Sequence, residues 1–116
     1  MQYLLLIYED EKHWENADYS SPEVAAIMGQ YQAFGKEYAA AIQGGNALQP
    51  TSTAKTVRVR DGKAVVSDGP FAETKEQLGG YYLVEANSAE EAAAMAAKIP
   101  GARTGSVEVR PIQTFS

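Results

Sequence analysis

Residues 3–8 read Tyr-Leu-Leu-Leu-Ile-Tyr, and this unbroken apolar run is the stretch that decides the fold. A strand that is apolar at every position is buried on both faces, so it is expected at the centre of its sheet. Six residues are too few to cross a bilayer, which takes about 20. No basic segment or cleavage site precedes the run, as it would in a secretion signal. We therefore predict a cytoplasmic protein with this central strand near its start.

Two segments downstream of this strand have the pattern of amphipathic helices. The first is expected to start at Ser20 or Ser21, where Pro22 suits the first turn, and to end at Gly44-Gly45. Its apolar stripe recurs every three or four residues: Val24, Ile27, Met28, Tyr31, Phe34, Tyr38, Ala41 and Ile42. The second starts with a capping box of Ser88 and Glu91 and ends at Pro100-Gly101. Its inner face is predicted to be Ala92, Met95, Ala96 and Ile99.

The remaining segments read as strands. Residues 56–60 alternate between polar and apolar side chains, and Asp61-Gly62 is a strong signal for a two-residue hairpin turn that leads into residues 64–66. Further strands are predicted at 80–85 and 107–110.

This order of elements predicts one α+β domain over residues 1–116. It indicates a ferredoxin-like split βαβ antiparallel sheet, with two helices on one face and an inserted hairpin. No segment remains to cover the other face, although the central strands are apolar on both sides. We therefore expect a homodimer that packs through the sheet face, with a pocket between each sheet and its helices or at the rim of the dimer.

Composition and motifs exclude several classes of function. The chain has no cysteine and a net charge of −5, and its Lys and Arg residues are scattered. This argues against thiolate metal sites, against binding to nucleic acid and against a membrane span. The chain carries neither a phosphate-binding loop nor a dinucleotide fingerprint, and no metal-ligand spacing, so no cofactor and no metal are expected.

Residues 68–82, Asp-Gly-Pro-Phe-Ala-Glu-Thr-Lys-Glu-Gln-Leu-Gly-Gly-Tyr-Tyr, resemble the signature of the DGPF branch of the YCII-related family. The likeness extends to the segments 56–62, 99–100 and 107–111 and to the opening strand, and so covers nearly the whole chain. It implies a ferredoxin-like fold of the dimeric α/β barrel type that dimerises through its sheets.

Family resemblance also bears on function. The resemblance implies that related proteins use a His–Asp pair, with the histidine on the first helix. It also implies that some of these proteins are lyases or isomerases of small ring compounds. Here the matching stretch is Gln30-Tyr31-Gln32, and the single histidine, His13, lies before the helix. The resemblance further implies a genetic context beside sigma factors.

Asp68 is the first candidate for a catalytic residue. A carboxylate beside Phe71 and near Tyr81 could be partly desolvated and act as a general base. Alternatively, Asp68 bonds only to the backbone amides of its own turn.

Four further side chains are candidates for ligand binding. Tyr31, Phe71 and Tyr81 could line an aromatic pocket, and Lys75 could bind a substrate carboxylate. The alternative places the tyrosines in the core or dimer interface and leaves Lys75 in a solvated charged run.

His13 belongs to the acidic segment 9–15. We interpret this segment as a mobile acidic loop rather than a metal site. If it folds over a pocket, His13 and Trp14 are its natural lid residues.

Two classes of function follow. The first is a small-molecule-binding protein, including a lyase or isomerase that acts on a small organic acid or lactone with Asp68 as general base. The second is a non-catalytic dimeric interaction or regulatory module linked to sigma-factor regulation. The irregular, polar segment 68–79 favours the first class slightly.

Overall fold

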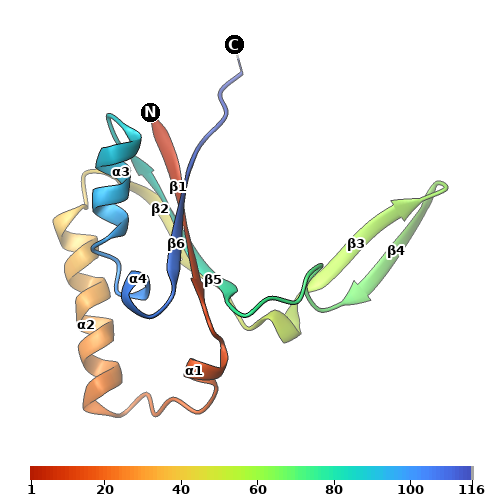
Figure 1. Ribbon diagram of the computed structural model, residues 1–116, viewed down its shortest axis with the longest axis horizontal. Coiled ribbons are helices and arrows are strands. Elements are labelled where there is room, and N and C mark those ends of the chain that lie inside the picture. The colour runs from red at the N-terminus through yellow and green to blue at the C-terminus, as the bar shows by residue number, and fades with distance from the viewer. Residues whose placement is uncertain (116) are drawn as a thin grey trace.

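The structure is a computed structural model that describes residues 1–115, and its centre is a four-stranded antiparallel sheet (Figure 1). The strand order is β2-β5-β1-β6. The strands are β1 (Gln2–Glu9), β2 (Ile42–Ala47), β5 (Gln77–Glu85) and β6 (Ser106–Pro111). A helix connects β1 to β2 and another connects β5 to β6, which confirms the predicted ferredoxin-like arrangement.

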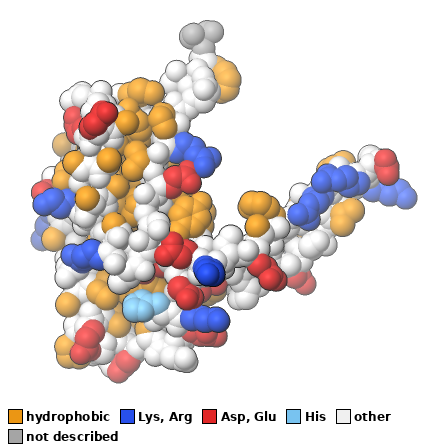
Figure 2. Space-filling model, viewed as in Figure 1, with side chains coloured by type: hydrophobic (Ala, Val, Ile, Leu, Met, Phe, Trp, Pro, Cys, Tyr) orange, Lys and Arg blue, Asp and Glu red, His pale blue; other side chains and the backbone are white. Residues whose placement is uncertain are grey.

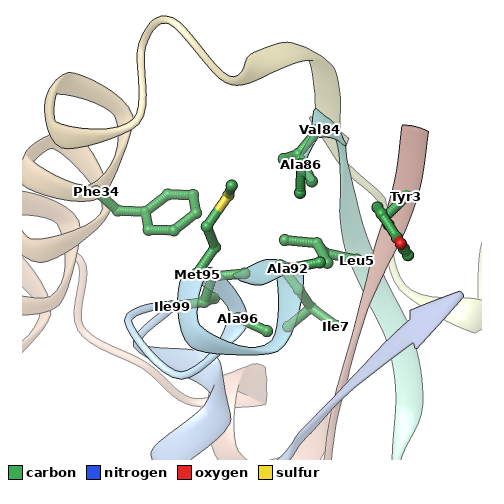
Figure 3. Packing of buried hydrophobic residues seen from close by; sticks show 10 residues of the cluster. All are labelled: Tyr3, Leu5, Ile7, Phe34, Val84, Ala86, Ala92, Met95, Ala96 and Ile99. Carbon is green, nitrogen blue, oxygen red and sulfur yellow. The ribbon is translucent and has the colours of Figure 1, made fainter. Parts of the chain in front are cut away.

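Strand β1 occupies the centre of the sheet, as its apolar run predicted. Its side chains alternate, and Tyr3, Leu5 and Ile7 are buried on the helical side. The core there is completed by residues from β5 and from both long helices, including Phe34 of α2 and Met95 of α3 (Figure 3). Its buried members are Tyr3, Leu5, Ile7, Phe34, Val84, Ala86, Ala92, Met95, Ala96 and Ile99.

Helix α2 (Pro22–Glu37) begins where the sequence predicted and ends earlier. The side chain of Ser21 accepts a hydrogen bond from the amide of Val24 and caps the helix. The expectation that Gly44-Gly45 ends this helix is wrong, because both glycines belong to β2. At Gly45 a Cβ atom would lie 2.7 Å from the carbonyl oxygen of Tyr81, so this glycine is needed for close pairing with β5.

Helix α3 (Ala89–Ala96) agrees closely with the prediction. Ser88 is its N-cap and accepts a hydrogen bond from the amide of Glu91 at 3.1 Å. The four residues of the predicted inner face are all buried. After Pro100 the chain forms one more helical turn, α4 (Gly101–Thr104), before β6 begins.

The predicted hairpin forms, but outside the main sheet. Strands β3 (Lys55–Arg60) and β4 (Lys63–Asp68) pair only with each other, and they turn at Asp61 and Gly62, whose φ angles are 52° and 75°. Residues 55–68, called the arm below, project from the body on the side away from the helices (Figure 1). A short 3₁₀ helix, η1 (Thr51–Thr53), precedes the arm.

The side of the sheet opposite the helices carries apolar residues that no element of the described chain covers. Leu4 lies opposite Leu83 and Leu6 lies opposite Tyr81 in the β1–β5 register, and all four are partly exposed. We call these four residues the open face. Among residues 1–115, no helix has the length and apolar character that a membrane crossing requires.

Candidate functional site

A cleft of about 240 Å³ opens where β1 ends, between α2 and α4. The short helix α1 (Lys12–Glu15) forms its outer side. The lining combines one carboxylate, one guanidinium, a phenol, an imidazole and an indole with apolar walls. These residues are Glu9, His13, Trp14, Ile27, Gln30, Tyr31, Pro100, Gly101, Arg103 and Thr104.

Glu9 is the last residue of the central strand, and two neighbours hold its carboxylate. Oε2 accepts a hydrogen bond from Nε1 of Trp14 at 3.0 Å and another from Oγ1 of Thr104 at 3.0 Å. Oε1 has no donor among the hydrogen bonds of the described residues. One carboxylate oxygen is thus fixed while the other is available to a ligand in the cleft.

Two glycines allow α4 to approach the end of β1. At Gly101 a Cβ atom would lie 2.8 Å from Oε1 of Glu9, 2.8 Å from Cγ2 of Ile7 and 3.1 Å from the hydroxyl of Tyr31. Both distances start from the same Cβ position. Oε1 of Glu9 and the hydroxyl oxygen of Tyr31 are therefore at most 5.9 Å apart, which is 2.8 Å plus 3.1 Å. At Gly105 a Cβ atom would collide with the carbonyl of Tyr8.

Tyr31 enters the cleft from α2. Burial, and next the negative charge of Glu9, raise the pKa of Tyr31 to about 12. The hydroxyl therefore stays protonated at neutral pH and can donate a hydrogen bond. A donor and an acceptor, Tyr31 and Glu9, thus face the same small space.

Arg103 supplies the positive charge of the cleft. Its Nη2 donates a hydrogen bond to Oε1 of Gln30, which holds the guanidinium between α4 and α2. The remaining donors of a guanidinium suit a carboxylate or another oxyanion.

Helix α1 covers the cleft, so the segment predicted as a mobile loop is a tethered helical turn. The rings of His13 and Trp14 meet edge to face, with 5.3 Å between their centroids. The carboxylate of Glu11 accepts hydrogen bonds from the amide and the hydroxyl of Thr51, at 2.6 and 2.8 Å. His13 and Trp14 therefore line the cleft from α1, which is called the lid helix below.

A wider groove of about 1330 Å³ continues from the cleft along the β2–β5 half of the sheet, and Glu9, Trp14 and Tyr31 line both spaces. Its other lining residues come from α2, from the segment before β3 and from the segment after β4. Its floor includes Gly45, Ala47 and Gly80, which carry little or no side chain. The groove exists because the side chains at these positions are too small to fill the space above the sheet. This location, between a sheet and its own helices, is one of the two that the sequence suggested.

Of the six residues proposed from sequence, the structure brings only Tyr31 and His13 into the cleft. Tyr81 lines the wider groove and its hydroxyl accepts a hydrogen bond from Nδ2 of Asn46 at 3.0 Å. Phe71 is 80% exposed and Lys75 is exposed, and neither lines either space.

Asp68 lies at the end of β4, on the arm. Its side chain is 86% exposed and forms an ion pair with Lys55 on the neighbouring strand. The partial desolvation expected for a general base is therefore missing in one copy of the chain. The chain bends directly after Asp68 at Gly69, whose φ of 92° is a conformation that favours glycine.

Sequence reasoning missed Glu9 and Arg103. Glu9 is the first charged residue after the apolar run and the last residue of β1. Arg103 had no local signal, because only the fold brings α4 next to β1. No cluster of three or more His, Cys, Asp or Glu side chains suited to a metal ion occurs in residues 1–115.

Comparison with known proteins gives a family and similar chains. The family model described as YCII-related domain matches residues 1–116. An uncharacterized protein of Rhizobium meliloti (strain 1021), R00369, is 40% identical over 119 residues, covering 99% of this chain and 94% of its own. The 5-chloro-2-hydroxyhydroquinone dehydrochlorinase of Burkholderia phenoliruptrix AC1100, solved in complex with 2,5-dihydroxybenzoquinone, is similar with a TM-score of 0.49 and 15% identity, over 97% of this chain and 94% of that one.

Proposed function

This chain belongs to the YCII-related domain family, and on that premise we propose that it binds a small planar organic acid or lactone in the cleft formed by Glu9, Tyr31 and Arg103. The single observation that carries the proposal is the convergence of an acceptor, a donor and a cation on one space lined by aromatic rings. The Asp68-Gly69-Pro70-Phe71 sequence supports placing the protein in the DGPF branch of the family.

The cleft by itself has room for a ligand with a single ring. The cleft measures about 240 Å³, below the 300–1,000 Å³ of sites for drug-sized molecules. Trp14, Ile27 and Pro100 supply apolar walls, which favour a flat hydrophobic body. Arg103 selects for a negative group on that body, because a guanidinium binds a carboxylate through two parallel hydrogen bonds.

Proton transfer next to a carbonyl is the chemistry that this geometry favours, in a lyase or isomerase reaction. Oε1 of Glu9 would accept a proton from the ligand carbon, while the hydroxyl of Tyr31 donates a hydrogen bond to the oxygen on which negative charge develops. The protonated Glu9 then returns the proton to a different carbon or to a leaving group. This assignment places the general base at Glu9 in place of Asp68.

Calorimetric titration of the purified chain with benzoate, salicylate and an unsaturated five-membered lactone tests the proposal. We expect at least one of the three to bind, with an affinity that falls at least tenfold in Arg103→Met and Glu9→Gln. Asp68→Asn is the matched control, since it removes a carboxylate charge from the arm. If Asp68→Asn weakens binding as strongly as Glu9→Gln, the cleft is not the site.

The alternative is a non-catalytic dimeric module for interaction or regulation, including regulation linked to a sigma factor. It would be favoured if none of the probes bound at millimolar concentration while the protein still captured a defined partner.

A further inference from the structure

The cleft is continuous with the much larger groove beside it. Glu9, Trp14 and Tyr31 line both spaces, so a ligand that contacts them in the cleft can extend into the groove. The groove measures about 1330 Å³ and the cleft about 240 Å³. Ligand sites bury most of the surface of the molecule they hold. A ring in the cleft therefore leaves room for a second part of the same molecule in the groove.

The two spaces have opposite charge. Arg103 lines the cleft and does not line the groove. The groove is lined by one ammonium group, that of Lys12, and by the five carboxylates of Glu9, Asp10, Glu11, Glu15 and Glu73. Figure 2 shows acidic side chains gathered between the histidine and the base of the arm. The cleft thus suits a negative group, and the groove suits a positive one.

The negative charge of the groove is not neutralised by ion pairs within residues 1–115. The three ion pairs there lie elsewhere, at Met1–Glu85, Lys55–Asp68 and Glu108–Arg110. The carboxylate of Glu11 is held by the amide and hydroxyl of Thr51, whereas Glu15 and Glu73 are exposed. A hollow surface lined by charges of one sign raises the local concentration of ligands of the opposite sign.

The uncharged part of the groove suits an alkyl chain that ends in a cation. Its floor at Gly45, Ala47 and Gly80 carries little or no side chain, so a chain can lie close to the sheet. Aromatic rings also line the groove, and the face of an aromatic ring attracts an ammonium group. These rings belong to Trp14, Tyr19, Tyr31, Tyr81 and Tyr82.

We infer that the groove is a second subsite, which holds a tail of the ligand that ends in a cationic amine. The inference rests on the proposed function, because it takes the ring and its carboxylate to occupy the cleft at Arg103. The ligand class becomes narrower: a small ring acid joined by a flexible chain to an ammonium group. Its two charges fix its direction, since exchanging the ends would bring like charges together at both subsites.

The experiment is calorimetric titration of the full chain with three matched ligands. They are para-substituted benzoates with tails of equal length that end in a primary amine, a hydroxyl or a carboxylate. In 50 mM NaCl we expect the amine-tailed benzoate to bind at least tenfold more tightly than the hydroxyl-tailed one. We expect the carboxylate-tailed benzoate to bind at least tenfold more weakly than the hydroxyl-tailed one. Both differences should shrink in 500 mM NaCl, because salt screens exposed charges.

Two pairs of substitutions place the effect in the groove. Glu15→Gln with Glu73→Gln should reduce the preference for the amine over the hydroxyl tail at least fivefold. Glu37→Gln with Glu90→Gln is the matched control, because it removes the same charge from exposed positions on α2 and α3 that line neither space. The control pair should leave the preference unchanged. Circular dichroism verifies that both variants are folded.

Phenylbutylamine, which has the ring and the amine but no carboxylate, separates this inference from the proposed function. If benzoate does not bind while phenylbutylamine binds and is weakened by Glu15→Gln with Glu73→Gln, the acid site in the cleft fails and the cationic subsite stands. If benzoate binds at the cleft while the three tailed benzoates bind equally, the groove is not a cationic subsite. Equal effects of the two pairs of substitutions would also overturn the inference.

Discussion

Nε1 of Trp14 donates a hydrogen bond to Oε2 of Glu9 at 3.0 Å, and this bond connects the lid helix to the end of the central strand. Trp14→Phe keeps a ring in place and removes the donor. We expect the free energy of unfolding to fall by about 1 kcal/mol, because Glu9 keeps the hydroxyl of Thr104 as a partner. Urea unfolding followed by circular dichroism measures this. An unchanged midpoint would mean that the bond does not hold the lid.

Tyr31 makes a prediction about pH. Its pKa in the folded chain is about 12, above the value of about 10 in the unfolded chain. Below pH 10 both states keep the proton, and between pH 10 and 12 only the unfolded state releases it, so stability falls with rising pH. We expect about 1 kcal/mol of this loss to disappear in Tyr31→Phe, after allowance for solvent screening of a partly exposed group.

The same residue can be followed directly. Ultraviolet titration of the phenolate band should show a tyrosine that ionises near pH 12 and is missing in Tyr31→Phe. If the two titration curves coincide, Tyr31 is not in the environment described.

Gly101 and Gly35 form a matched pair for testing the close approach of α4 to β1. Gly101→Ala places a methyl group 2.8 Å from Ile7 and from Glu9, which we expect to cost about 1–3 kcal/mol and to weaken ligand binding. Gly35→Ala meets nothing within 4 Å inside α2 and should stabilise the protein by about 0.5–1 kcal/mol. Thermal unfolding of both variants decides, and equal shifts would contradict the packing at Gly101.

Gly44 and Gly45 test the assignment of this pair to β2. Gly45→Ala would push a methyl group to 2.7 Å from the backbone of Tyr81, so we expect a loss of about 2 kcal/mol. Gly44→Ala has open space around it and should change stability by less than about 0.5 kcal/mol. Similar melting temperatures for the two variants would argue that these glycines do not pair with β5.

Asp68→Asn should leave the stability of the body within about 1 kcal/mol of wild type, because an exposed ion pair contributes little. Denaturant unfolding monitored by the fluorescence of Trp14, which lies in the body, measures this effect. A larger loss would contradict the exposed position of Asp68 on the arm.

Local patterns in the sequence were sufficient for most elements. The apolar run of β1, the cap at Ser88 with the inner face of α3, and the Asp61-Gly62 turn were predicted because their causes lie within a few neighbouring residues. Helix α2 was predicted too long because its stripe continues into Ala41 and Ile42, which contact the core after the helix has ended. Pairing with β5, a distant segment, overrides that local pattern.

The candidate site was less predictable for the same reason. Tyr31 and His13 were identified from residue type and position, but Glu9 and Arg103 are 94 positions apart in the sequence. Asp68 drew attention through its motif, and the structure places it on the arm.

By itself, the sequence determined the central strand, the starts of the two long helices with their inner faces, and the hairpin turn, because periodicity, capping and backbone preference act over short distances. Only the tertiary structure decided that Gly44-Gly45 is a strand, that the hairpin stands apart as an arm, and that Glu9, Tyr31 and Arg103 face one cleft. These features depend on which distant segments lie together, and that is fixed by burial of the whole chain rather than by any local pattern.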